Sequence, residues 1–192
     1  QYMAENKVGF AIVVDDNMVL QGLVDDATIL NRLRGAEFGL RVREVMTPRV
    51  FTVPPSSSLM EAANLMTDLR VRRLPVVEAG KVRGMLTVTD LLNYLLMEEK
   101  HVEMLLYDVS LDELFKVAVE EVMKKEVLSV APDDDVGAAV EVMVGSDVSG
   151  LPVLAEDGSL VGLVSRIDVL SGLTCFKGPS AVLDAMVAQL VC

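Results

Sequence analysis

The sequence predicts an α+β protein in which one β-α-β-β-α unit occurs twice and the second half of that unit occurs once more. A long repeat leads to this prediction: residues 72–77 and 84–90 return as residues 149–154 and 162–168, 77 to 78 positions later. A weaker copy lies within residues 9–28. Self-similarity at such a spacing is typical of a domain-sized structural unit. The chain has 192 residues, 52% of them hydrophobic, which is enough to bury sizeable cores.

The first complete repeat carries clear boundaries for five elements. The predicted elements are a strand at 50–53, a helix at 59–69, strands at 74–77 and 82–86, and a helix at about 89–96. Pro54 and Pro55 end the first strand, and the serines at 56–58 offer N-caps for the helix. The apolar positions of that helix fall at helical spacing and are Leu59, Ala62, Ala63, Leu65, Met66 and Leu69. A turn around Gly80 joins the two later strands.

The second complete repeat has the same order. Its predicted elements are a strand at 127–130, a helix at 136–144, strands near 151–154 and 160–164, and a helix at 167–173. Each repeat has a sheet too small to make a large core alone, so we expect the two repeats to pack face to face. Between them, the apolar residues Val102, Leu105, Leu106 and Val109 predict a packed helical linker.

Composition limits the function classes. A formal charge of −12 argues against nucleic-acid binding, so any anionic ligand needs local cations, and arginine clusters at Arg70, Arg72 and Arg73. No apolar run approaches the roughly 20 residues of a membrane span, so we expect no membrane insertion in this fragment. Because Gln1 falls inside a predicted helix, we expect the natural start to lie earlier, and any targeting segment with it.

The inventory of reactive side chains predicts no enzyme. One histidine and two cysteines offer neither a metal-site spacing nor a thiol-base pair, and no paired catalytic carboxylates are visible. The same cysteine usage predicts a reducing, cytoplasmic location. Most of the eleven methionines fall at helical core spacing, where they are typical gap-fillers.

The order and spacing of these motifs resemble the CBS (cystathionine-beta-synthase) domain. The resemblance rests on Arg72-Arg73-Leu74-Pro75-Val76-Val77, a turn, and then Gly-apolar-apolar-Thr/Ser-x-x-Asp leading into a last helix. It implies tandem CBS domains packed as a pseudo-twofold pair, which is called a Bateman module. The implied organisation is a partial CBS motif at 1–34, CBS domains at 41–97 and 118–174, a helical linker at 98–117 and a C-terminal helix at 178–192.

The resemblance also implies a function. Such modules are regulatory and commonly bind adenosine-containing effectors such as AMP, ADP, ATP, S-adenosylmethionine or NAD-type cofactors, with no cofactor required. We therefore expect an adenine-nucleotide sensor that changes its packing or its oligomeric contacts, most simply as a homodimer acting on a regulated protein. The alternatives left open are a ligand-free dimerisation module and the cytosolic regulatory part of a transporter or enzyme.

The resemblance places two candidate clefts on this sequence. In the first, Asp90 would take the ribose hydroxyls, Thr87 would fix the sugar or phosphate, and Arg73 would grip phosphate, as in the nucleotide-binding subunit of the AMP-activated kinase. The adenine wall of this cleft would come from Met123, Leu128, Val148 and Ser149. In the second cleft, the corresponding residues are Ser165 and Asp168, with Met46, Thr47, Phe51, Val71 and Arg72 across from them. Gly150 replaces the arginine there, so this cleft is expected to bind weakly, to bind an uncharged adenosine, or to be empty.

The residues of the first cleft also fit purely structural roles. Thr87 and Asp90 match a capping box at the start of a helix, and capping is compatible with binding. The arginines could simply pair with Asp68 and Glu78 at the surface, where such pairs contribute little.

The two ends of the chain carry separate expectations. In the N-terminal copy, Asp25 and Thr28 exchange the usual positions and Phe10 replaces the arginine, so we expect no nucleotide site there but a structural remnant that covers a sheet edge or helps dimerisation. The tail after Gly178-Pro179-Ser180 predicts a helix, and we expect it to pack beside residues 1–34, within the chain or from a neighbouring copy. Its apolar positions are Val182, Leu183, Ala185, Met186, Val187 and Leu190.

Overall fold

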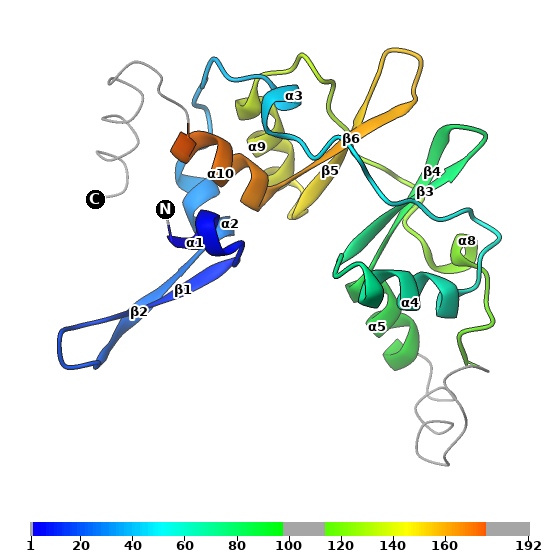
Figure 1. Ribbon diagram of the computed structural model, residues 1–192, viewed down its shortest axis with the longest axis horizontal. Coiled ribbons are helices and arrows are strands. Elements are labelled where there is room, and N and C mark those ends of the chain that lie inside the picture. Colours follow the sequence, from blue (N-terminus) through cyan, green and yellow to red (C-terminus); the bar gives the residue numbers. More distant parts are fainter. Residues whose placement is uncertain (1, 98–113, 176–192) are drawn as a thin grey trace. The chain divides into compact units, whose positions relative to one another are not determined.

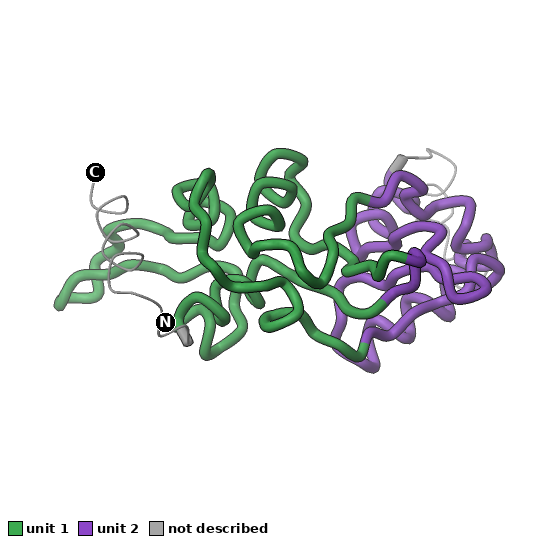
Figure 2. Tube along the Cα trace, turned by 90° about the horizontal axis from the view of Figure 1, so that it is seen from above, with its two compact units in different colours: residues 1–49, 128–156, 161–192 green, residues 50–127, 157–160 purple. Residues whose placement is uncertain are grey.

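A computed structural model describes residues 2–97 and 114–175 of the chain. These residues contain both helices and strands, in agreement with the α+β prediction, and every sheet that they form is a two-stranded hairpin (Figure 1). The chain divides into two units, each with its own apolar core (Figure 2). Unit 1 contains residues 1–49, 128–156 and 161–192, and unit 2 contains residues 50–127 and 157–160.

Unit 2 is built on one helix and one hairpin of the first complete repeat. Its main elements are α4 (Leu59–Asp68), β3 (Arg73–Glu78), β4 (Lys81–Thr87) and α5 (Val88–Met97). A capping box starts α4, because the Ser58 hydroxyl accepts from the amide of Glu61 at 3.1 Å while the Glu61 carboxylate accepts from the amide of Ser58 at 3.0 Å. The apolar stripe of α4 is buried in one cluster with Leu74, Val76 and Leu86 of the hairpin. Helical spacing in the sequence thus predicted the buried face correctly.

The β3–β4 hairpin has a defined register. Ala79 and Gly80 both adopt positive φ values, 49° and 78°, which is typical of the two-residue turns that suit the twist of a hairpin. The pairing runs antiparallel from Glu78 opposite Lys81 to Arg73 opposite Thr87. The hairpin therefore ends with these last two residues side by side, at the point where α5 begins.

Unit 1 repeats this arrangement with the second complete repeat. Its elements are α9 (Val136–Gly145), β5 (Gly150–Leu154), β6 (Leu160–Ser165) and α10 (Arg166–Cys175). The Asp135 carboxylate starts α9 by accepting from the amide of Gly137 at 2.8 Å, and it also accepts from the amides of Phe38 and Gly39. Leu151, Val153 and Val164 are buried under this helix in one cluster.

Each unit also includes a short segment that precedes the other repeat. In unit 1 this segment contains α3 (Val42–Val45), and in unit 2 it contains α8 (Val119–Val122). After α3, Thr47 bridges Leu163 of β6, and after α8, Lys124 bridges Met85 of β4. The chain crosses from one repeat to the other and back, so neither unit is a single continuous repeat.

The strands predicted at 50–53 and 127–130 are wrong as full strands. Each is reduced to one parallel bridge, Val53 with Val76 and Val130 with Val153. Val53 and Val130 each make both backbone hydrogen bonds to the partner strand. The next residue on the paired side lies two positions later and is a proline in both repeats, Pro55 and Pro132, which has no N–H to donate.

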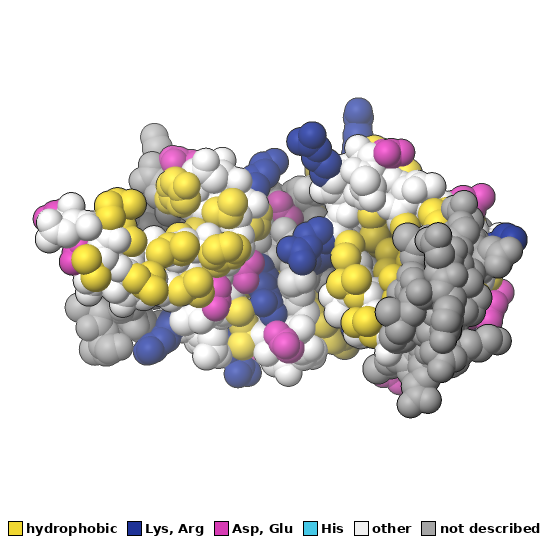
Figure 3. Space-filling model, turned by 90° about the horizontal axis from the view of Figure 1, so that it is seen from below, with side chains coloured by type: hydrophobic (Ala, Val, Ile, Leu, Met, Phe, Trp, Pro, Cys, Tyr) yellow, Lys and Arg dark blue, Asp and Glu magenta, His cyan; other side chains and the backbone are white. Residues whose placement is uncertain are grey.

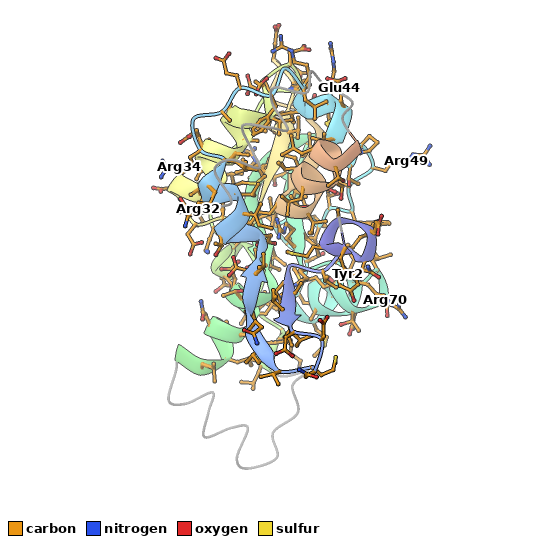
Figure 4. The ribbon with its side chains drawn as sticks, turned by 90° about the vertical axis from the view of Figure 1, so that its left-hand side faces the viewer. Tyr2, Arg32, Arg34, Glu44, Arg49 and Arg70 are labelled. Atoms are coloured by element: carbon orange, nitrogen blue, oxygen red, sulfur yellow. The ribbon has the colours of Figure 1, made fainter. Side chains whose placement is uncertain are left out.

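The N-terminal part of unit 1 contains α1 (Tyr2–Asn6), β1 (Phe10–Val14), β2 (Leu20–Asp25) and α2 (Asp26–Arg32). These elements are the hairpin and last helix of a repeat, with α1 in front of the hairpin at the place where α4 and α9 end. The Val8 amide donates to the Met3 carbonyl oxygen as Val71 does to Met66 and Val148 to Met143. After α2, Arg34 (labelled in Figure 4) pairs with Glu141 of α9 at 3.1 Å. The amide of Gly35 donates to the same carboxylate at 2.7 Å. The predicted helices at 98–113 of the linker and 178–192 of the tail lie outside the described residues.

Candidate functional site

The Thr87–Asp90 pair forms the start of α5. Asp90 Oδ2 accepts from the Thr87 amide at 2.8 Å and from the Thr87 hydroxyl at 2.6 Å, and the Asp90 amide lies 3.2 Å from Thr87 Oγ1. This is the reciprocal geometry of a capping box, so the capping role is realised. It uses only one carboxylate oxygen, which leaves Asp90 Oδ1 for other donors.

Asp90 is the one polar or charged residue among the buried residues of the described chain, with 6% of its surface exposed. A buried carboxylate is stabilised only if donors surround it. Its second oxygen, Oδ1, has Lys124 Nζ at 3.4 Å, and the lysine itself is largely exposed. Capping and pairing together thus satisfy both oxygens of this side chain.

Lys124 is a residue of this site that the sequence prediction missed. It reaches Asp90 because its backbone pairs with Met85 through two hydrogen bonds of 2.9 and 3.0 Å. Gly84 makes this approach possible, since a Cβ atom there would collide with Met123 Sδ and lie 2.9 Å from the Lys124 carbonyl oxygen. The repeat alignment held the signal, because Lys124 falls 77 positions after Thr47 and therefore occupies its place.

Arg73 lies directly opposite Thr87 in the hairpin and is half-buried, while Arg72 is exposed. Cross-strand partners hold their Cβ atoms roughly 5 Å apart, so the stem of Arg73 starts beside the helix that Thr87 caps. Unit 2 thus brings the Lys124 ammonium, the Thr87 hydroxyl and the buried Asp90 carboxylate together at the start of α5, with Arg73 opposite Thr87 in the hairpin. Guanidinium and ammonium groups bind phosphate, and a carboxylate accepts from paired hydroxyls.

Unit 1 contains the second version of the site, with fewer charges. Asp168 Oδ2 accepts from the Ser165 amide at 2.8 Å and from the Ser165 hydroxyl at 2.6 Å, which repeats the capping geometry. Gly162 allows Met46 and Thr47 to approach β6 as Gly84 does in unit 2. However, Gly150 stands in place of Arg73, and Thr47 in place of Lys124.

Arg166, which follows Ser165, has a structural role in this unit. Its side chain is only 11% exposed, and its guanidinium donates to the Val148 carbonyl oxygen at 3.2 Å. It also pairs with Asp147 at 3.0 Å and with Asp26 of α2 at 3.6 Å. These contacts tie the N-terminal repeat to the second complete repeat and engage the guanidinium on three sides.

The other predicted wall residues divide between the units. Met123 belongs to unit 2 with Arg73, Thr87 and Asp90, whereas the remaining wall residues of the first cleft, Leu128, Val148 and Ser149, belong to unit 1. For the second cleft, Met46 and Thr47 belong to unit 1 with Ser165 and Asp168, and Phe51, Val71 and Arg72 belong to unit 2. Phe51 and Leu128, which occupy the same position of the two repeats, expose 52% and 45% of their surface. The part these wall residues play stays a prediction.

The exchanged residues of the N-terminal copy, Asp25 and Thr28, form the cap of α2. Asp25 Oδ1 accepts from the Thr28 amide at 2.6 Å, and this hydrogen bond is the main reason that the pKa of Asp25 lies below its ordinary value. Within residues 2–97 and 114–175, no group of three or more His, Cys, Asp or Glu side chains could hold a metal ion. Over the same residues, no helix has the length and apolarity needed to cross a bilayer.

Comparisons with known proteins agree with this repeated hairpin and capped-helix geometry. The model of the CBS domain matches residues 42–97 and 119–174. The chain therefore belongs to the CBS domain family.

This chain is similar to the following three proteins. An uncharacterized 33.4 kDa protein in a ribosomal RNA operon of Thermofilum pendens is 33% identical over 184 residues, which is 96% of this chain and 60% of that protein. The crystal structure of MJ1225 from Methanocaldococcus jannaschii, a proposed archaeal homolog of g-AMPK, has a TM-score of 0.78 and 27% identity, covering 89% of this chain and 61% of that one. CBSX2 of Arabidopsis thaliana in complex with AMP has a TM-score of 0.59 and 25% identity, covering 71% of this chain and 97% of that one. The chain spans about 60% of the length of the curated relatives MJ1225 and the Thermofilum protein.

Proposed function

We propose that this chain is a regulatory module that senses an adenine nucleotide at the start of α5. Asp90 Oδ1 accepts from the ribose hydroxyls, Thr87 orients the sugar, and Arg73 and Lys124 hold the phosphate. The observation that carries the proposal is the buried Asp90 carboxylate, whose one oxygen caps α5 with Thr87 and whose other oxygen pairs with Lys124. Arg73 lies opposite Thr87 in the same hairpin. The complex of similar CBSX2 with AMP supports the ligand class.

The arrangement also gives a mechanism for sensing. When a ribose hydroxyl donates to Asp90 Oδ1, Lys124 loses its place at 3.4 Å and turns to the phosphate. Lys124 belongs to the segment that connects the two repeats. When Lys124 moves from Asp90 to the phosphate, that segment moves with it. A ligand can shift such an equilibrium only by its differential affinity for the two arrangements. We also propose that the module forms a homodimer and acts on a regulated protein. The proposal includes no catalytic activity.

Titration of the full 192-residue chain with AMP, ADP, ATP, NADH and S-adenosylmethionine tests the proposal, by thermal shift and by calorimetry. A ligand at a hundredfold excess over its Kd raises the free energy of unfolding by about 2.7 kcal/mol, which is easily seen. We expect phosphorylated nucleotides to bind more tightly than S-adenosylmethionine, which is a cation. If no adenosyl ligand binds, the ligand-free dimerisation module is the better description.

A further inference from the structure

The last helices of two repeats pack on each other in unit 1. The helix α2 of the N-terminal repeat contacts α9 and α10 of the second complete repeat. Leu30 of α2 and Leu170 of α10 occupy the same position of their helices, and both belong to one buried apolar cluster. Asp26 and Arg166, the first residues of these two helices, form an ion pair of 3.6 Å. Contacts between equivalent residues are what packing about an approximate twofold axis produces.

The last helix of the first complete repeat exposes the corresponding face. Leu92 of α5 corresponds to Leu30 and Leu170, which are 0% and 8% exposed, but Leu92 itself is 51% exposed. Leu96, one turn later, is 67% exposed. Burial of such side chains is favourable, so a partner that offers the same kind of face can bind there.

In unit 1 this packing uses complementary charges. Arg166 meets Asp26, and Arg34, which follows α2, meets Glu141 of α9 at 3.1 Å. Each pair joins residues of opposite charge from two different repeats. On a copy of itself, such a helix would bring its charged first residue opposite the same residue, and like charges across an interface are unfavourable.

The corresponding positions of unit 2 are neutral. They hold Val88 where α2 and α10 have Asp26 and Arg166, Leu96 in place of Arg34, and Asn64 of α4 in place of Glu141. A twofold contact puts Val88 opposite the partner's Val88, and Leu96 beside the partner's Asn64. Neither contact brings like charges together. The helix α5 therefore suits association with a copy of itself, whereas α2 and α10 suit each other.

The β1–β2 hairpin presents a larger apolar surface, which is visible as yellow side chains at the left-hand end of Figure 3. The complete repeats show what covers such a hairpin. Gly84 lies against Met123, and Gly162 lies against Met46. A Cβ atom at Gly22, the same position of β2, would meet nothing within 4 Å. A second copy has no such methionine segment to offer, because both of its own are used in the same way. A second copy thus fits α5 better than it fits the hairpin.

We propose that two copies of this chain associate through α5, about a twofold axis that passes near Val88 and Leu92. Leu92 and Leu96 are then buried between the copies, as Leu30 and Leu170 are buried in the core of unit 1. The inference rests on the homodimer of the proposed function and names its surface, but it does not depend on nucleotide binding.

Sedimentation of the full 192-residue chain tests this surface. We expect a dimer, and Leu92→Asp should weaken self-association about a hundredfold, because each copy would then bury a charge against an apolar face. Leu92 is exposed in the single chain, so the fold of unit 2 should persist, and circular dichroism checks this. The matched control is Leu23→Asp on the β1–β2 hairpin, where Leu23 is 61% exposed, and it should leave the dimer unchanged. A monomeric natural chain, or a dimer that Leu92→Asp leaves intact, would overturn the proposal.

Crosslinking tests the twofold axis itself. The full chain carries Cys175→Ser and Cys192→Ser together with Val88→Cys, and is treated with a short bismaleimide. We expect covalent dimers, because Val88 lies opposite the partner's Val88. The control is Arg83→Cys, at an exposed position of β4 in the same unit, which should crosslink about tenfold less. Equal crosslinking at the two positions contradicts the proposed axis.

Titration of the same samples with AMP separates this inference from the proposed function. A monomer that binds AMP contradicts the dimer and leaves nucleotide sensing in place. A dimer that assembles through α5 but binds no nucleotide supports this inference and contradicts the nucleotide sensor.

Discussion

Arg73 and Thr87 are cross-strand partners at the open end of the β3–β4 hairpin. Thr87 caps α5 through Asp90, so one short ladder fixes the arginine, the hydroxyl and the carboxylate relative to each other. Rigid elements place such groups more accurately than loops do. The corresponding end of β5 starts with Gly150, which leaves the Ser165–Asp168 cap without an arginine. The two sites share their cap geometry and differ in charge.

The first prediction compares the two carboxylates. Asp90→Asn should weaken AMP binding about tenfold or more, because the amide keeps an acceptor for the Thr87 N–H but loses the charge that favours the ribose hydroxyls. Asp168→Asn should weaken it less than about threefold. Calorimetric titration of both variants checks this. Equal losses, or none from Asp90→Asn, would show that our ranking of the two sites is wrong.

Lys124 provides the second prediction. Lys124→Met should weaken binding of AMP by about three- to tenfold and leave adenosine binding equal or tighter, since the lysine holds phosphate but competes with ribose for Asp90. The control is Lys125→Met, which removes a charge from the adjacent exposed position. Calorimetry with AMP and with adenosine on each variant separates the two effects. The same loss for both ligands would refute a phosphate role for this residue.

A third prediction concerns the close approach of two backbones. Gly84→Ala should destabilise the chain by about 1–3 kcal/mol, because the new Cβ would collide with Met123 and crowd the Lys124 carbonyl oxygen at 2.9 Å. It should also weaken AMP binding by displacing Lys124. Gly145→Ala is the control, since it ends α9 with nothing within 4 Å and alanine favours helix. Urea unfolding and titration measure both effects. If Gly84→Ala were as stable as Gly145→Ala, the segment with Met123 and Lys124 would be able to move away from β4 at no cost in free energy.

Local rules were enough for much of this fold. Helical spacing predicted the buried stripes of α4 and α9, and Gly80 marked the hairpin turn. The prediction of a strand at 50–53 was wrong because an apolar run does not show whether the backbone of another strand lies close enough to pair with it. Pairing is decided by hydrogen bonds between distant segments, and Val53 makes only one bridge.

Some residues of the site were predicted from the sequence and one was missed. Thr87 and Asp90 stood out because their spacing is local, and the register then placed Arg73 beside them. Lys124 did not stand out, since nothing in its own neighbourhood marks it as more than a surface lysine. Its position follows from a bridge between segments that are 39 residues apart, Met85 and Lys124. Only a comparison of the repeats position by position would have revealed it.

The last prediction uses the cap of the N-terminal repeat as a pH probe. Hydrogen bonds from Thr28 hold the pKa of Asp25 below its ordinary value of 3.8, so the charged cap stabilises the folded chain. For a folded-state pKa that is depressed, this stabilisation is complete above pH 3.8 and is lost as the pH falls through the lower folded value. Asp25→Asn should therefore reduce the free energy of unfolding at about pH 6, and the difference from the natural chain should shrink towards about pH 3.

The measurement is urea unfolding at several pH values between about 3 and 6. Other carboxylates titrate in the same range, for example Glu141 and Asp157, whose pKa values are also lowered by hydrogen bonds. Taking the difference between the variant and the natural chain removes their common contribution, because these sites are unchanged. Asp16→Asn, exposed in the β1–β2 turn, is the matched loss of one negative charge and should give a nearly constant difference. A pH-independent difference for Asp25→Asn as well would mean that the cap contributes through its geometry and not through its charge.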